Sequence, residues 1–267
     1  MNTNQFLEPV FSVVIITLCV AFCANCNMAP AKRNVSKKDE KGFAVLELFT
    51  SEGCSSCPPA DKLMARIQQQ SHGEAIYILA YHVDYWNRLG WKDRFSDAAY
   101  SERQEQYQRW LNQSQIYTPQ VIVNGKAEFV GSDETAIRGA IAEELAAKPE
   151  ATLTLLDNLS NGKLNIQYQT TKEATGRRLL IVLVQKAAQS KVEGGENAGL
   201  TLPHVQIVRK FQSEPISVRG DGDVNIALPK GFSAQNWEVI GLVQNQGSGD
   251  ILAAAKAQLR DTANDRK

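Results

Sequence analysis

The chain has 267 residues, of which 43% are hydrophobic and 22% are charged, which is typical of a globular protein with enough apolar material for a core. Lysine and arginine together number 29, as do aspartate and glutamate. Because there is no basic excess to neutralise phosphates, the composition argues against nucleic acid as a partner.

The first 31 residues are predicted to be a signal peptide. Residues 10–24 form an uncharged apolar run, which suits a signal-peptide core and is short for a membrane span of about 20 residues. Ala29-Pro30-Ala31 follows as a small-x-small cleavage site. We therefore expect export to the periplasm or secretion. Because the basic residues follow the apolar run, an uncleaved anchor or a transient membrane association through this segment remains the alternative.

Residues 32–41 are polar and charged and are predicted to be a linker. The apolar run 43–49 then predicts a strand that is buried on both faces. Pro58 and Pro59 predict that a helix begins within a residue or two of Cys57, because proline is tolerated only in the first helical turn.

The remaining elements fall into two groups. Up to residue 148, the patterns predict a strand over 75–81, a helix over 97–111, strands over 120–123 and 126–130 joined by a hairpin turn at Asn124-Gly125, and a last helix capped by Ser132 or Asp133. From residue 151, they predict strands over 151–156, 163–170, 179–186, 204–211, 223–228 and 237–244, and a helix over 251–259.

Cys54 and Cys57 would be the remaining cysteines after cleavage near Ala31. A disulfide between residues three apart removes little chain entropy and is a poor structural staple, so the pair indicates redox chemistry or metal binding. A helix N-terminus stabilises a thiolate. We therefore expect Cys54 to be the exposed, attacking thiol and Cys57 to resolve the mixed disulfide, with Ser55 and Ser56 donating hydrogen bonds to the thiolate.

Two segments together resemble the thioredoxin and glutaredoxin superfamily. They are Cys54-Ser-Ser-Cys57-Pro58 at a strand-to-helix turn and the segment 117–125, which reads YTPQVIVNG. The strings 47–61 and 82–86 and the β-rich tail resemble a family of exported bacterial thioredoxin-like proteins labelled a domain of unknown function. The sequence differs from thioredoxin in two ways. Ser-Ser replaces Gly-Pro between the cysteines, and no tryptophan precedes Cys54.

The resemblance implies an α/β fold, with a thioredoxin-like domain over 42–148 followed by a mostly β domain over 151–267, for which a small sandwich is one arrangement. It implies that Pro119 is cis and faces the cysteines, where exposed backbone would pair with a substrate peptide. An ordinary trans proline at a strand start is the alternative. It also implies that Glu47 is a buried proton acceptor for Cys57; the alternative is that Glu47 reaches the domain surface or forms an ion pair with Lys126 or Arg138.

His82, Asp84 and Trp86 follow the second predicted strand, and Thr118 precedes Pro119. Because the carboxyl ends of parallel strands meet at one edge of a sheet, we expect these residues to form a substrate rim beside Cys54, together with Ser55 and Ser56. A packed aromatic loop is the alternative for this segment, and His82 is also a candidate metal ligand with Cys54 and Cys57.

The sequence thus predicts an exported thiol–disulfide oxidoreductase that needs no bound cofactor and acts on protein or small thiol substrates together with a redox partner. Two alternatives stay open. The chain could bind copper or zinc without turnover, or it could be a binding module that keeps the fold without catalysis.

The predicted processing site can be tested directly. N-terminal sequencing of the exported protein is expected to begin close to Lys32, because the small-x-small site ends at Ala31. Membrane-bound protein that retains Met1 would contradict cleavage and favour the anchor.

Overall fold

The structure is a computed structural model that describes residues 41–160, 163–171 and 175–259. The predicted signal peptide and nearly all of the predicted linker lie outside the described residues and stay predictions. The described residues belong to one compact unit. Within this part of the chain, no helix is long and apolar enough to cross a bilayer.

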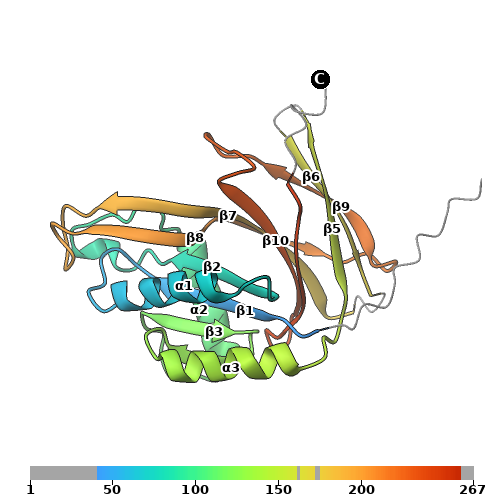
Figure 1. Ribbon diagram of the computed structural model, residues 1–267, viewed down its shortest axis with the longest axis horizontal. Helices are drawn as coiled ribbons and strands as arrows, with labels where there is room; N and C mark the ends of the chain where they lie inside the picture. Colours follow the sequence, from blue (N-terminus) through green and yellow to red (C-terminus); the bar gives the residue numbers. More distant parts are fainter. Residues whose placement is uncertain (1–40, 161–162, 172–174, 260–267) are drawn as a thin grey trace, which may run out of the picture. The chain divides into compact units, whose positions relative to one another are not determined.

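The main feature is a mixed sheet to which both halves of the chain contribute (Figure 1). In the described residues, its eight strands are, in sheet order, β11 (Ile251–Lys256), β10 (Trp237–Asn245), β7 (Arg177–Lys191), β8 (Thr201–Pro215), β2 (Ile76–His82), β1 (Ala44–Thr50), β3 (Gln120–Val123) and β4 (Ala127–Val130). β1 and β2 are parallel, and β8 joins β2 through a short parallel contact between Ala80 and Ile207.

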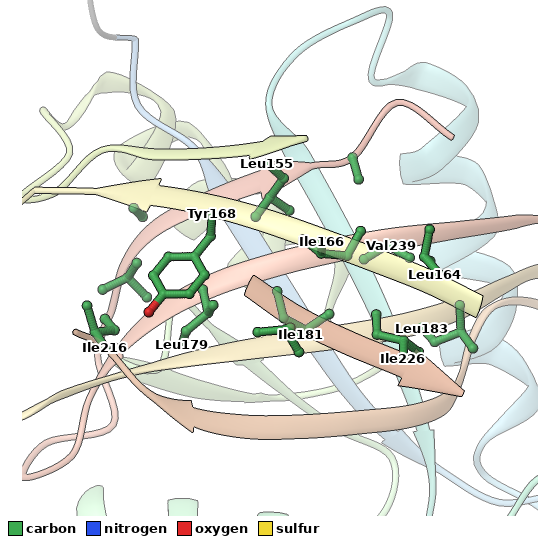
Figure 2. Packing of buried hydrophobic residues seen from close by; sticks show 14 of the residues in the cluster. Leu155, Leu164, Ile166, Tyr168, Leu179, Ile181, Leu183, Ile216, Ile226 and Val239 are labelled. Atoms are coloured by element: carbon green, nitrogen blue, oxygen red, sulfur yellow. The ribbon is translucent and has the colours of Figure 1, made fainter. Parts of the chain in front are cut away.

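A second, antiparallel sheet consists of β5 (Leu153–Ser160), β6 (Lys163–Thr170) and β9 (Asp221–Ala227). The three-stranded sheet lies beside β10 in Figure 1. Its apolar side chains pack against β7 and β10, and Figure 2 shows Leu164 and Ile166 of β6 facing Ile181 of β7 and Val239 of β10. Because side chains alternate along a strand, the opposite face of β7 is free to join a separate core with α2 (Ala98–Trp110).

The predicted fold class is wrong. The chain is not a thioredoxin-like α/β domain followed by a separate β domain, because β7, β8, β10 and β11 extend the sheet that contains β1 and β2. Without β8, β2 would be an exposed edge with unpaired backbone groups, and β8 covers that edge. Strand patterns in the sequence identified β7, β8 and β10 but carry no information about which strands become neighbours.

The predicted helix over 251–259 is also wrong, since residues 251–256 form β11 and pair antiparallel with β10. The sequence Ile251-Leu-Ala-Ala-Ala-Lys256 has high intrinsic helix propensity, but Ile251, Leu252 and Ala253 are buried in the cores on the two faces of the sheet. Tertiary packing therefore overrides local preference in this segment.

Local signals place the elements around the cysteines correctly. α1 (Pro58–Gln70) begins with a proline immediately after Cys57. Asp97 caps α2 by accepting a hydrogen bond from the backbone of Ala99, and Asp133 caps α3 (Glu134–Ala146) in the same way. The turn between β3 and β4 has positive φ at Asn124 and Gly125, as the hairpin prediction requires.

Candidate functional site

The cysteine pair lies where the end of β1 leads into α1. Cys54 and Cys57 form a disulfide with their Cα atoms 5.4 Å apart. Cys57 is the N-terminal cap residue of α1, and its backbone N–H donates to the carbonyl of Cys54 at 3.2 Å. The structure therefore confirms that the pair occupies a helix start, where unpaired N–H groups and the helix dipole stabilise a thiolate.

Both cysteines are fully buried, with exposed fractions of 0%. The expectation that Cys54 is exposed is therefore wrong, although Ser55 and Ser56 between the cysteines are exposed. The Ser56 hydroxyl lies 3.4 Å from the Cys54 sulfur, within hydrogen-bond reach. Ser55 has a different role, because its backbone N–H donates to the Glu196 carboxylate at 3.0 Å.

The segment that covers the disulfide is residues 192–200, which we call the β7–β8 loop. The side-chain amide of Asn197 donates to the carbonyl oxygens of Glu52 and Cys54, both at 2.9 Å. At Gly194 the backbone runs so close that an added Cβ would lie 2.8 Å from the carbonyl oxygen of Gly90. The backbone around Cys54 is thus contacted by a segment about 140 residues away in sequence.

We call residues 51–57, between β1 and α1, the cysteine loop. Beneath it lies a histidine–carboxylate cluster, made up of Glu52, Asp61, His82, Asp93 and His204. Nδ1 of His82 lies 2.6 Å from Oδ2 of Asp93, which also accepts the backbone N–H of Glu52 at 2.9 Å. The rings of His82 and His204 are 4.8 Å apart, and Nε2 of His204 lies 3.4 Å from Oε1 of Glu52. Five titratable side chains therefore share one buried site.

Burial and the attraction between opposite charges have opposing effects on the pKa values of His82, Asp93 and Asp61. Burial opposes the charged form of His82, but the Asp93 carboxylate holds the pKa of His82 above its usual value. The pKa of Asp93 is lowered, because His82 and two backbone N–H groups outweigh its burial. Burial raises the pKa of Asp61, and the nearby His204 and His82 offset part of that effect.

Several polar atoms of the cluster have no hydrogen-bond partner among the described residues. They are Oε1 of Glu52, Nε2 of His82 and both ring nitrogens of His204. The 3.4 Å separation between His204 and Glu52 is an ion-pair distance without hydrogen-bond geometry. Buried polar groups are normally paired, so these atoms leave the cluster with unsatisfied hydrogen-bonding capacity.

The Thr118–Pro119 bond is cis, as predicted. The indole N–H of Trp86 donates to the Thr118 hydroxyl at 2.8 Å, and the Trp86 Cβ lies 3.3 Å from where a Cβ on Gly53 would be. Trp86 therefore links the cysteine loop to the segment before β3. A Cβ on Gly131 would lie 2.8 Å from that of Pro119 and 3.1 Å from that of Ala60, which places Pro119 beside the first turn of α1.

Asp84, in contrast, does not belong to this group. Its carboxylate accepts from the hydroxyl of Ser101 in α2 at 2.6 Å, and its backbone N–H donates to the same hydroxyl at 3.2 Å. These contacts fasten the loop after β2 to α2, so the predicted rim role for Asp84 has no supporting geometry.

Glu47 is buried and fully engaged in an ion pair. Its carboxylate accepts from Arg103 at 2.5 and 2.9 Å and from the Tyr107 hydroxyl at 2.5 Å. Both partners lie in α2. The alternative partners that the sequence suggested, Lys126 and Arg138, pair with glutamates of α3 instead.

The two faces of β1 explain why Glu47 cannot serve Cys57. Leu46 and Leu48 point into the core beneath α1 and α3, whereas Glu47 points to the α2 side of the strand. The predicted role of Glu47 as proton acceptor for Cys57 is therefore wrong. The residue holds α2 onto the sheet.

A metal site is not supported by the geometry. Over residues 41–259, with the gaps given above, no three histidine, cysteine, aspartate or glutamate side chains are placed to hold a metal ion. His82 makes its close contact with Asp93, not with the sulfurs. The copper or zinc alternative therefore has no ligand set in the described residues.

Sequence reasoning missed six residues of the site: Glu52, Asp61, Asp93, Glu196, Asn197 and His204. Asp61 could have been found, because it follows Cys57 by four residues and so lies on the same face of the predicted helix. Asp93 lies in an irregular loop, and Glu196 and Asn197 lie in a distant hairpin. No local pattern connects these three to the cysteines.

Comparison with known proteins gives a family and a fold. The family described as "Protein of unknown function (DUF1223)" matches residues 45–244. None of the curated proteins matches the chain. A crystal structure of a protein from Agrobacterium tumefaciens is similar, with 24% identity, a TM-score of 0.65 and coverage of 84% of this chain and 98% of that one. HBP35 of Porphyromonas gingivalis is similar with 16% identity, a TM-score of 0.61 and coverage of 86% and 80%. At these identities, the two structures show the fold alone.

The Glu47–Arg103 pair makes a testable contribution to stability. Glu47→Gln leaves the buried guanidinium without a counter-charge and is expected to lower the free energy of unfolding by about 3–5 kcal/mol in denaturant titrations. The double variant Glu47→Leu/Arg103→Met removes both charges and should recover most of that loss. A Glu47→Gln protein within about 0.5 kcal/mol of the parent would contradict a structural role, since changes of that size are typical of surface sites.

Proposed function

The chain belongs to the DUF1223 family, whose description states no function, and we propose that it is an exported thiol–disulfide oxidoreductase. One observation carries the proposal. The Cys54–Cys57 disulfide lies at the start of α1, and Asp61 of the same helix belongs to a buried cluster of titratable side chains. Exchange passes electrons through the sulfurs, and a buried thiolate needs a nearby group to exchange its proton.

The electrons follow a two-step exchange. A substrate thiolate attacks the Cys54 sulfur, the Cys54–Cys57 bond breaks, and Cys57 leaves as a thiolate with the electron pair. A second substrate thiolate then attacks the substrate sulfur of the mixed disulfide and releases the Cys54 thiolate. The substrate dithiol is oxidised to a disulfide, and the protein gains two electrons; the reverse sequence oxidises the protein.

The protons need a protein route because Cys57 is sealed from solvent. Asp61 is suited to this role: its backbone N–H donates to the Cys57 carbonyl at 3.1 Å, and residues four apart on a helix have neighbouring side chains. Burial raises its pKa, which makes the protonated form of its carboxyl easier to reach than in a free aspartate. Asp61 would donate a proton to the departing Cys57 thiolate and accept it when Cys57 attacks a mixed disulfide.

A relationship to the thioredoxin-like superfamily is part of this proposal. It is supported by the Cys-x-x-Cys pair at the start of α1 and by Thr118–Pro119 beside the first turn of that helix. Export rests on the apolar run of residues 10–24 and the Ala29-Pro30-Ala31 site. An oxidising compartment is consistent with a disulfide that forms and reopens.

Trapping tests the exchange reaction. Cys57→Ser leaves Cys54 able to attack but removes the resolving thiol, so mixed disulfides with partners should accumulate and appear as slow bands on non-reducing gels. Cys54→Ser should abolish those bands. If neither variant yields mixed disulfides in the exporting cell, the oxidoreductase proposal fails.

A pH profile tests the role of Asp61. Decay of a mixed disulfide on Cys54 should slow as pH falls through the raised pKa of Asp61, because the protonated carboxyl cannot accept the Cys57 proton. Asp61→Asn should remove this step from the profile and slow decay by about 10²-fold at pH 7, a typical effect of general base catalysis.

A matched control is Glu238→Gln, which changes a buried carboxylate of β10 that pairs with Lys256. It should leave the profile unchanged. An Asp61→Asn protein with the parent's profile would show that Cys57 obtains its proton elsewhere.

A further inference from the structure

The β7–β8 loop makes directed contacts to the backbone around Cys54. Glu196 accepts the Ser55 N–H, and Asn197 donates to the carbonyls of Glu52 and Cys54. The loop thus satisfies one donor and two acceptors on either side of the sulfur that an exchange partner must reach. Hydrogen bonding from the Ser55 side chain, and then from its backbone N–H, lowers the pKa of the Glu196 carboxyl.

The loop is anchored at its base, and its tip makes one exposed and one buried set of contacts to the cysteine loop. At the base, the N–H of Val192 donates to the Leu200 carbonyl at 2.9 Å, the N–H of Gly199 donates to the Val192 carbonyl at 2.8 Å, and Val192 is fully buried. At the tip, the side chain of Glu196 is exposed and its contact with Ser55 is open to competition from water. Asn197 is buried, so uncovering Cys54 requires its two hydrogen bonds to be replaced while the base and the sheet stay in place.

We propose that the β7–β8 loop occupies the docking surface of the exchange partner, and that this partner is a polypeptide segment that presents a carboxylate to the Ser55 N–H and an amide donor to the Cys54 carbonyl. The inference rests on the proposed exchange function. The partner replaces Glu196 and Asn197 and gains the same hydrogen bonds, so lifting the loop leaves no buried backbone group unpaired.

A polypeptide fits this surface better than a small thiol does. Cys54 has no exposed surface while the loop is closed, so any partner must compensate for the displaced contacts. A small thiol supplies few contacts besides its sulfur, whereas a peptide segment supplies donors and acceptors at regular spacing. Once seated, the partner thiolate attacks Cys54 and Cys57 leaves, with the electron balance described above.

The test compares loop variants in the rate at which dithiothreitol reduces the folded, full-length protein. Glu196→Ala/Asn197→Ala should accelerate reduction by about 10-fold or more, because each lost hydrogen bond shifts the closed-loop population by roughly 2- to 10-fold. Glu196→Gln keeps an acceptor and should show a smaller increase. Glu193→Ala changes an exposed carboxylate of the same loop and should leave the rate unchanged.

Hydrogen exchange at Ser55 reports the loop independently of redox chemistry. Its amide should exchange faster in the double variant and at the parent's rate in Glu193→Ala. A synthetic peptide with the sequence of residues 191–201 should slow reduction of the double variant. The same peptide with alanine at the positions of Glu196 and Asn197 should have no effect.

The outcomes separate the two proposals. If Ser55 exchanges faster but dithiothreitol reduces the double variant at the parent's rate, the loop does not gate the disulfide and the inference is overturned. If the rate rises but the peptide does not compete, or glutathione reduces the parent as fast as the double variant, a polypeptide docking surface is excluded. If no thiol reduces either folded protein, the proposed exchange function itself fails.

Discussion

Complete burial of the Cys54–Cys57 disulfide is the constraint on which the rest of the site depends. A sulfur without solvent contact can exchange neither protons nor partners with water. Under the proposed exchange function, the protein needs a proton carrier near the sulfurs and a way to uncover them. We assign these two tasks to the histidine–carboxylate cluster and to the β7–β8 loop, both of which contact the cysteine loop.

The junction between β2 and β8 brings both features to the cysteines. β8 lies beside β2 in the sheet, and the ring of its His204 packs against that of His82 at the end of β2. The β7–β8 loop, which leads into β8, contacts the Cys54 carbonyl through Asn197. The second half of the chain is thus part of the site, because it completes the buried cluster and covers the disulfide. Because the sheet is continuous, both halves of the chain contribute residues to this site.

Local sequence signals made part of the fold predictable. Prolines after Cys57 fixed the start of α1, Asp97 and Asp133 capped their helices, and Asn124-Gly125 set the hairpin turn. Long-range pairing was not predictable. The partner of Glu47 is 56 residues away on α2, and the contacts of Asn197 span more than 140 residues. The resemblance to thioredoxin also suggested the wrong buried acid, because Glu47 lies on the face of β1 opposite α1.

The most direct test of a buried but exchange-competent disulfide is a redox titration of the purified protein in which the Cys54–Cys57 bond and the fold are followed together. We predict that the bond opens and re-forms reversibly while the circular dichroism spectrum stays native, and that its potential falls as pH rises because protons are taken up with the electrons. Reduction that occurs only as the protein unfolds would contradict this account and make the disulfide a structural bond.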